Sequence, residues 1–329
     1  MTGSPGPGRF GLPFFNAMKN MFSIVFLTAL IVACQCTPDS KPDDDGLIDD
    51  NLPSVPVTPD DPSQAGSGET DGYKLVWADY FNGTSLNTDD WNIEVNGDGG
   101  GNRELQYYRA ENISVADGCL ILTARKENYS GKEFTSGRLN TKRKRFFTHG
   151  KIESSIRLPK TANGLWPAFW LLGNDIDTNP WPKCGEIDIM EMGNVAGIKA
   201  GTQETFFNGA CHWGFYQNGA YPNYARSLNA PYSLQDGKFH LFTLIWDEQS
   251  IAMYLDLDKN PSAEPYYKMD IVDNNGDWAV AKYFHHDFFI VYDLAVGGNF
   301  PSIWSAAGIT ALEGGDASMY IDFVKVYQK

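Results

Sequence analysis

The chain is poor in cysteine. Five cysteines occur among 329 residues, and Cys34 and Cys36 belong to an N-terminal leader. The spacing of the other three, Cys119, Cys184 and Cys211, is not that of a zinc site, so we expect none. An odd set cannot pair completely, and the sequence is compatible both with a Cys184–Cys211 disulfide and with three free thiols. Cys119 lies in an apolar run and is expected to act as a small core residue.

Positive charge is also scarce. Lysine and arginine number 26 against 41 aspartates and glutamates, which gives a formal net charge of −15. This balance argues against nucleic acid and against anionic membrane surfaces as partners. Aromatic residues make up 14% of the chain, a content that suits a β core or a groove that stacks on flat ligands. We expect a monomer.

Helical periodicity is missing from residue 73 onward, where side chains alternate instead. Within 151–158, Ile152, Ile156 and Leu158 share one face with Ser154. The same period of two recurs in 251–256 and 320–327, whereas 288–296 is apolar on both faces, as in a central strand. Clusters of Gly, Asn and Asp predict turns at 96–101, 194–201 and 273–277. The pattern predicts an all-β fold, one large antiparallel sandwich over residues 72–329 with no second domain.

Residues 1–36 have the features of a targeting segment. From Met18 the chain has a short basic start, a compact apolar stretch and small residues before Cys34, which is typical of a signal peptide and too short for a stable membrane span. Residues 31–34 (IVAC) resemble a bacterial lipobox, in which the cysteine is lipidated. An ordinary signal peptide with an incidental cysteine is the alternative.

Residues 37–71 contain ten acidic residues, six prolines and one lysine. Such a segment cannot bury a core, so we expect an acidic, extended, disordered tether. An acidic stretch directly after a lipidated cysteine also resembles the surface-export signals of Bacteroidetes lipoproteins. We therefore expect a cell-envelope lipoprotein whose lipid anchor lies in the outer membrane, with the domain exposed at the surface.

The segment GEIDIMEMG at 185–193 carries three carboxylates on one predicted strand. Glu186 and Asp188 point to one face, but Glu191, five residues from Glu186, points to the other in a regular strand. A β-bulge near Ile189 and Met190 returns Glu191 to the face of Glu186 and Asp188. The two glutamate backbones then lie on the order of 13 Å apart. Their side chains can lean together to the ~5–5.5 Å between carboxyl groups that is typical of retaining glycosidases.

Three carboxylates this close cannot all be ionised cheaply, so at least one pKa is expected to rise. That division leaves one nucleophile and one protonated acid. A solvated acidic strand edge is the alternative. Nearby, Trp166 and Trp170 lie four residues apart in a strand-like run and share one face. Tryptophans there either stack on sugar rings or belong to the core.

Residues 73–329 resemble glycoside hydrolase family 16, in particular its laminarinase-like branch. The matching segments, in the family's order, are ELQYY (104–108), TSGRLNTK (135–142), GKIE (150–153), LWPAFW (165–170), GEIDIME (185–191), HWG (212–214), LAVGGN (294–299) and YIDFVKVY (320–327). The resemblance implies a β-jelly-roll sandwich of the concanavalin or lectin type, with a concave sheet that forms an open polysaccharide groove. The loop 194–211 departs from the family, and such loops decide the depth and subsite shape of a groove.

The resemblance implies that Glu186 is the nucleophile, Glu191 the general acid and then base, and Asp188 the carboxyl partner between them. It implies substrate-binding positions at Asn102, Glu104, Arg138, Trp166, Trp170, His212 and Trp213. His212 alone would more often be structural. The family often carries a structural Ca²⁺, for which Asp322 and Gly118 fit, although such an ion needs more oxygen ligands than these two. No cofactor is expected for catalysis.

The expected activity is endo-hydrolysis of β-1,3- or mixed-linkage β-1,3/1,4-glucan with retention of configuration. A family 16 hydrolase for agar, porphyran or carrageenan is a second interpretation. A non-catalytic surface glycan-binding lipoprotein is a third; it would need the aromatic residues but not the three acids.

Overall fold

The computed structural model describes residues 72–329. The expected leader at 1–36, with its lipidation site Cys34, and the expected tether at 37–71 lie outside these residues. Within the described part of the chain, no helix is long and apolar enough to cross a membrane.

Two sheets of eight strands form the domain. The first, sheet A, runs in the order β16 (Tyr267–Asp270), β15 (Ser250–Leu255), β14 (His240–Trp246), β9 (Gly150–Arg157), β18 (Ala317–Gln328), β5 (Cys119–Ala124) and β4 (Ile113–Ala116), and β1 (Lys74–Asp79) also pairs with β18. The second, sheet B, runs in the order β13 (Asn223–Asn229), β12 (Phe206–His212), β11 (Glu186–Met192), β10 (Leu165–Gly173), β17 (Phe288–Val296), β7 (Arg138–Asn140) and β2 (Asn92–Ile93), and β8 (Phe146–Phe147) also pairs with β17. A small parallel pair joins β3 (Gln106–Tyr108) to β6 (Phe134–Ser136).

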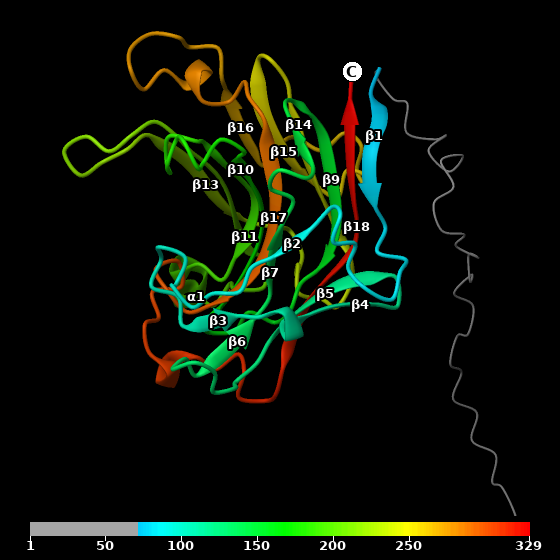
Figure 1. The fold of residues 1–329 in the computed structure, drawn as a ribbon, viewed down its shortest axis with the longest axis vertical. Coiled ribbons are helices and arrows are strands. Elements are labelled where there is room, and N and C mark those ends of the chain that lie inside the picture. Colours follow the sequence, from blue (N-terminus) through cyan, green and yellow to red (C-terminus); the bar gives the residue numbers. More distant parts are fainter. Residues whose placement is uncertain (1–71) are drawn as a thin grey trace, which may run out of the picture. The chain divides into compact units, whose positions relative to one another are not determined.

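The strand predictions at the core are confirmed. In β9, Ile152, Ser154 and Ile156 are fully buried, as the period of two requires. Every residue of β17 is buried, which fits its central place in sheet B. The sheets pack face to face over one large apolar cluster, and Figure 1 shows β9, β18 and β1 in one layer and β10, β11 and β13 in the other. The domain is the predicted antiparallel sandwich, which has the jelly-roll architecture.

The predicted turn at 194–201 was wrong, because these residues form the short helix α1 (Val195–Ala200). Asn194 caps its N-terminus by accepting a hydrogen bond from the Ala196 amide, and Gly201 ends it in the left-handed conformation. Asn and Gly are turn residues and helix-end residues alike, so composition could not separate the two. The expected loop to Cys211 also contains most of β12. Residues 72–329 also contain the 3₁₀ turns η2 (Ala110–Asn112), η3 (Val280–Lys282) and η4 (Ala306–Gly308).

No disulfide joins Cys184 to Cys211. Both thiols are free and buried, as is Cys119. Cys211 belongs to the large core between the sheets, whereas Cys184 packs in a smaller cluster with Leu172 and Phe289. Of the two arrangements left open by the sequence, the structure has the free thiols.

Candidate active site

A β-bulge in β11 brings the three acids together. Between β10 and β11, Trp170 pairs with Asp188 but Phe169 pairs with Met190, so Ile189 has no partner of its own. The same irregularity lies between Asp188 and Glu191 on the β12 side. The predicted bulge is confirmed.

The bulge changes which side chains face the sheets' shared core. Ile187, Ile189, Met190 and Met192 all pack there and are fully buried. The extra residue lets two consecutive side chains, Ile189 and Met190, face inward. Glu191 therefore faces the same side as Glu186 and Asp188.

That side is a groove of about 840 Å³ on the face of sheet B opposite the core. Its lining includes six of the seven expected substrate-binding residues and all three acids: Asn102, Glu104, Arg138, Trp166, Trp170, His212, Glu186, Asp188 and Glu191. The groove therefore collects residues as far apart in the sequence as Asn102 and His212.

Glu186 is the most accessible of the three acids, with 17% of its side chain exposed. Its Oε1 lies 4.0 Å from His212 Nε2, and Trp181 donates a hydrogen bond to its carboxylate. Burial and the charge of Asp188 raise the pKa of Glu186 well above its usual value, while His212 and Trp181 oppose the rise. These two groups therefore favour the ionised form of Glu186.

Asp188 lies close to His212, whose Nε2 is 3.3 Å from Asp188 Oδ2. Tyr221 Oη is 3.2 Å from the other ring nitrogen, Nδ1. Burial, and then the charge of Asp293, raise the pKa of Asp188 well above its usual value. Asp188 is thus suited to hold a proton between the two glutamates.

Both carboxylate oxygens of Glu191 accept hydrogen bonds. Trp166 Nε1 donates to Oε1 over 3.0 Å, and Asn208 Nδ2 donates to Oε2 over 2.7 Å. Burial and the charge of Asp188 nevertheless raise the pKa of Glu191 to about 8. Glu191 is therefore protonated at neutral pH and held in a fixed orientation, as a general acid requires.

Aromatic side chains line the groove beside both glutamates, Trp166 at Glu191 and Trp181 at Glu186. Trp166 stacks on Phe300 with ring centroids 4.8 Å apart. The rings of Trp181 and Tyr221 meet edge to face, with their centroids 4.9 Å apart. Both sets line the groove, and flat apolar rings beside hydrogen-bonding groups suit the faces of sugar rings.

Comparisons with known proteins agree with this geometry. The family model "Beta-glucan synthesis-associated protein SKN1/KRE6/Sbg1" matches residues 29–177. The β-glucanase of Rhodothermus marinus is 33% identical over 278 residues, which cover 81% of this chain and 90% of that protein. A solved family 16 enzyme of the mixed-linkage glucan locus of Bacteroides ovatus, bound to a G4G4G3G product, is 40% identical with a TM-score of 0.67, and the match covers 77% of this chain and all of that one.

The chain belongs to glycoside hydrolase family 16. Its similarity to solved endo-glucanases of the family places it in the laminarinase-like branch. The clotting factor G alpha subunit of Tachypleus tridentatus is 34% identical over 260 residues, but the chain spans only 34% of that longer protein.

One residue that was expected to line the groove of this family 16 domain lies elsewhere. Trp213 does not line the groove; it packs against the core, 5.8 Å from Phe284 between ring centroids, and donates a hydrogen bond to the Trp278 carbonyl. Its neighbour His212 faces the acids. Consecutive residues at the end of a strand point to opposite faces, so only one of the pair can reach the substrate side.

The sequence reasoning missed Asp293, which lies in β17 and lines the groove. Trp170 Nε1 donates to Asp293 Oδ1 over 2.7 Å. Burial raises the pKa of Asp293 to about 7, although the nearby Arg138 guanidinium lowers it. A single acid within an otherwise apolar strand was the available signal, because buried carboxylates need partners.

Arg138 and Glu104 organise the groove on the side of Asp293. Arg138 Nε lies 3.0 Å from Glu94 Oε2, and its guanidinium carbon is 5.0 Å from the centroid of the Trp170 ring. Glu104 accepts hydrogen bonds from Gln106 (2.6 Å) and from the Tyr108 hydroxyl (3.0 Å). Asn102 Nδ2 lies 3.4 Å from the other Glu104 oxygen. These contacts hold the polar groups in fixed positions relative to one another.

The acids of the family 16 groove also form a group with metal-binding chemistry. Glu186, Asp188 and His212 have ligand atoms within 4.8 Å of one another. Two of the three are expected catalytic acids, so we assign this cluster to catalysis.

The expected calcium residues lie on sheet A. Ile321 pairs with Leu120, so the next residue of β18, Asp322, lies near the turn that carries Gly118. Burial and then the charge of Asp322 raise the pKa of the Cys119 thiol, which follows Gly118. Asn82 Oδ1 is 4.0 Å from the position that a Cβ on Gly118 would take. A carboxylate, an amide oxygen and a backbone carbonyl are the hard ligands that Ca²⁺ takes, so the residues present fit the ion.

Proposed function

We propose that this chain cleaves β-1,3- or mixed-linkage β-1,3/1,4-glucan internally, with retention of anomeric configuration. The observation that carries the proposal is the bulge in β11, which sets Glu186 and Glu191 on the same face of one groove. A retaining enzyme needs such a pair, one carboxylate to attack the sugar and one carboxylic acid to protonate the departing oxygen. The relatives named as β-glucanases support the choice of polymer.

In the first step the Glu186 carboxylate attacks the anomeric carbon, and the bond to the leaving oxygen breaks as Glu191 donates its proton. A glycosyl ester on Glu186 results. In the second step Glu191 takes a proton from water, whose oxygen attacks the same carbon and releases Glu186. Asp188, protonated between the two, donates a hydrogen bond that stabilises Glu186 as its charge returns.

Hydrolysis of laminarin and barley β-glucan tests this assignment. Glu186→Gln is expected to reduce the release of reducing sugar to background, and Glu191→Gln to reduce it about 10²–10⁴-fold, the usual contribution of a general acid. Glu204→Gln, at an exposed ion pair with Lys160, is the matched control and is expected to retain activity. Undiminished activity of Glu186→Gln on both polymers would remove the assignment.

Retention has a separate test. Proton NMR of the first products distinguishes the anomers, and the β-anomer is expected before mutarotation. Initial formation of the α-anomer would contradict the double displacement but leave the substrate assignment intact.

A sulfated polymer such as porphyran or carrageenan is less well supported. Arg138 is the single Lys or Arg among the described residues that line the groove, and it already pairs with Glu94. Agarose, porphyran and carrageenan belong in the same substrate panel, and cleavage of one of them in preference to both glucans would favour the second interpretation. Binding without turnover is also less well supported, since all three acids line the groove.

We propose further that Cys34 is lipidated and holds the domain at the outer face of the outer membrane. The support is the sequence alone, a lipobox-like IVAC followed by an acidic segment. Cys34→Ala is expected to move the protein from the membrane fraction to the soluble fraction of cells, whereas Cys36→Ala leaves it in place. Membrane retention of the Cys34 variant would contradict the anchor. Protease treatment of intact cells tests its orientation.

A structural Ca²⁺ held by Asp322 and the Gly118 carbonyl is also proposed, on the oxygen chemistry described above. The ion would tie β18 to the β4–β5 turn and take no part in the reaction. Chelation is expected to lower the melting temperature and added Ca²⁺ to restore it, with Asp322→Asn insensitive to both. An equal effect of chelation on Asp322→Asn would place the ion elsewhere.

A further inference from the structure

A second hollow, of about 420 Å³, lies away from the groove. His149, His285, Glu248, Gln249 and Asn274 contribute polar side chains to it, and none of its lining residues lines the groove. The whole chain has five histidines, and two of them meet here. The proposed hydrolysis does not use this hollow.

Strand register brings the two histidines together. Phe147 of β8 pairs with Phe288 of β17, and the two strands are antiparallel. One histidine lies two positions after Phe147 and another lies three positions before Phe288, so both leave this strand pair at the same end. These are His149 and His285, whose Nε2 and Nδ1 atoms lie 2.9 Å apart. Gly150 pairs with Trp246, which brings the β14–β15 turn with Glu248 to the same end.

The orientation of both rings is set by their surroundings. His285 Nε2 is 3.1 Å from the Ile271 carbonyl and can only donate to it, which leaves Nδ1 with its lone pair toward His149. Metal-binding histidines are commonly oriented by such a bond to a backbone carbonyl. The His149 ring stands at 86° to that of the buried Trp246, with centroids 5.0 Å apart.

We propose that His149 and His285, with Glu248 as a third ligand, bind a divalent transition metal ion such as Zn²⁺ at this hollow. The ion takes the place of the proton that the two nitrogens share, and that proton moves to His149 Nδ1. Two nitrogens on one tetrahedral Zn²⁺, each about 2.0–2.1 Å from it, lie roughly 3.3 Å apart. The observed 2.9 Å therefore needs to widen by only a few tenths of an ångström.

The ligand set favours a transition metal over Ca²⁺ or Mg²⁺. Imidazole nitrogens suit Zn²⁺, Cu²⁺ and Ni²⁺, whereas hard cations take oxygen ligands. Glu248 is exposed on its turn, so its side chain can rotate into the hollow and supply the carboxylate. Water completes the coordination.

Calorimetric titration of the untagged chain with ZnCl₂ tests the proposal. The wild type is expected to bind a single Zn²⁺ tightly, and His149→Asn and His285→Ala are each expected to lose that binding. Asn is chosen at 149 because this residue has a φ of 60°, which Asn tolerates. His286→Ala is the matched control: that ring contacts the Cys184 carbonyl and does not line the hollow, so binding is expected to persist.

The groove cluster of Glu186, Asp188 and His212 is the competing location. Zn²⁺ binding that survives in His285→Ala and is lost in His212→Ala would overturn the proposal, as would failure of the wild type to bind. Two independent variants guard against a folding defect, which circular dichroism detects. Because the readout is binding and not hydrolysis, the result does not depend on the proposed glucanase activity.

Discussion

The protonation of Glu191 depends on the two groups that donate hydrogen bonds to its carboxylate. Asn208 donates to one oxygen and Trp166 to the other, and both bonds favour the ionised form. Burial works in the opposite direction and prevails, so the pKa lies at about 8. The residue is therefore an acid at neutral pH and becomes a base once it has given up its proton.

Loss of Asn208 is expected to shift the pH dependence of the reaction. Without its donor the ionised carboxylate is less stable, so the pKa of Glu191 rises above its value of about 8. The alkaline limb of kcat/KM, which falls as the acid loses its proton, then moves to higher pH in Asn208→Ala. The measurement is a pH profile of kcat/KM on a soluble β-glucan.

Ser227→Ala is the control for this profile. The Ser227 hydroxyl donates to Asn208 Oδ1 over 2.8 Å and does not touch Glu191. The alkaline limb of the kcat/KM profile of Ser227→Ala is expected to stay close to that of the wild type. A limb that moves to lower pH in Asn208→Ala would mean that Glu191 is not the group that titrates.

At the scale of elements, the bulge in β11 depends on the opposite sheet. Tyr266, directly before β16, reaches across the core and donates a hydrogen bond to the carbonyl of Ile189, the extra residue of the bulge. Bulges leave ladder groups without their strand partner, so a buried donor must supply one. The position of Glu191 is thus set partly by a hydroxyl group of sheet A.

Tyr266→Phe is expected to lower both stability and activity. An unsatisfied buried carbonyl costs about 1–3 kcal/mol of unfolding free energy, and a relaxed bulge displaces Glu191 from Trp166 and Asn208. Urea unfolding measures the first effect and kcat on β-glucan the second. Tyr267→Phe removes a similar bond, to the Tyr224 carbonyl, but leaves the bulge intact, so it is expected to lose stability with kcat preserved. Equal kcat in both variants would contradict this role of Tyr266.

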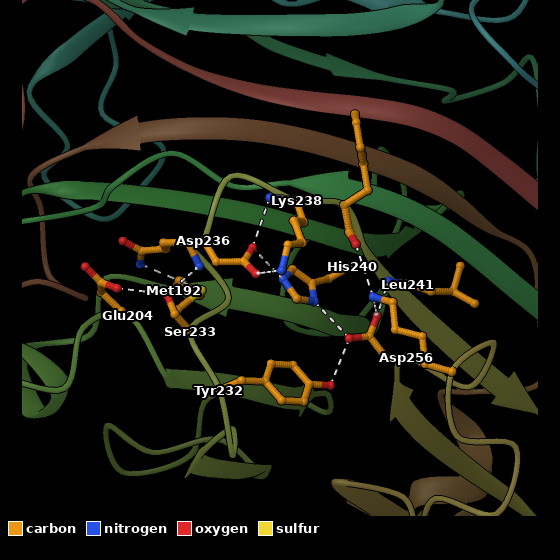
Figure 2. A network of polar contacts seen from close by, with 12 residues as sticks. Met192, Glu204, Tyr232, Ser233, Asp236, Lys238, His240, Leu241 and Asp256 are labelled. Carbon is orange, nitrogen blue, oxygen red and sulfur yellow. Dashed lines mark hydrogen bonds and ion pairs between the residues drawn. The ribbon is translucent and has the colours of Figure 1, made fainter. Parts of the chain in front are cut away.

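At the scale of the whole domain, an ionic network around the buried His240 and Asp256 lies where β14 begins and β15 ends. Figure 2 shows His240 between Asp236 and Asp256, with the Tyr232 hydroxyl also donating to Asp256. Burial would raise the pKa of Asp256, but hydrogen bonds from His240, the Leu241 amide and other donors outweigh it, so the pKa is strongly lowered. Gln235, on the same loop, contacts Met192 at the end of β11.

Asp256 is expected to make the fold sensitive to acid. Folding lowers the pKa of this carboxylate, so the carboxylate stabilises the protein at pH values above its usual pKa of 3.8. The contribution is lost as the pH falls below that value. Asp256→Asn is expected to cost roughly 2–4 kcal/mol at neutral pH, since it removes one partner of buried charged hydrogen bonds.

Denaturant unfolding at pH 7 and at pH 3 checks this expectation. The difference in unfolding free energy between wild type and Asp256→Asn is expected to narrow at the lower pH, because the carboxylate of the unfolded wild-type chain takes up a proton there while that of the folded protein stays ionised. Asp258→Asn, on the exposed part of the same turn, is the control and is expected to differ little from wild type. A gap that stays constant with pH would show that packing, and not charge, accounts for the loss.

Much of the fold could be predicted because its signals are local. The alternation in β9, the apolar run of β17 and the parity conflict between Glu186 and Glu191 all lie within a few residues, and the structure confirms each of them. Residue type and order alone decide which side of a strand is apolar. The turn expected at 194–201 failed because the same residue types cap a short helix.

The pairing of distant segments required the tertiary structure. Tyr108 meets Asp293 across 185 positions, and His149 meets His285 across 136, because the fold brings strands that are far apart in the sequence close together in space. The burial that raises the pKa of Glu191, and the turning of Trp213 toward the core while His212 faces the groove, also arise only when the two sheets close. The sequence by itself determined the acids, their strand and the need for a bulge, since these follow from local geometry. Only the folded sandwich decided their partners and protonation, because both depend on neighbours that the chain brings together from far apart.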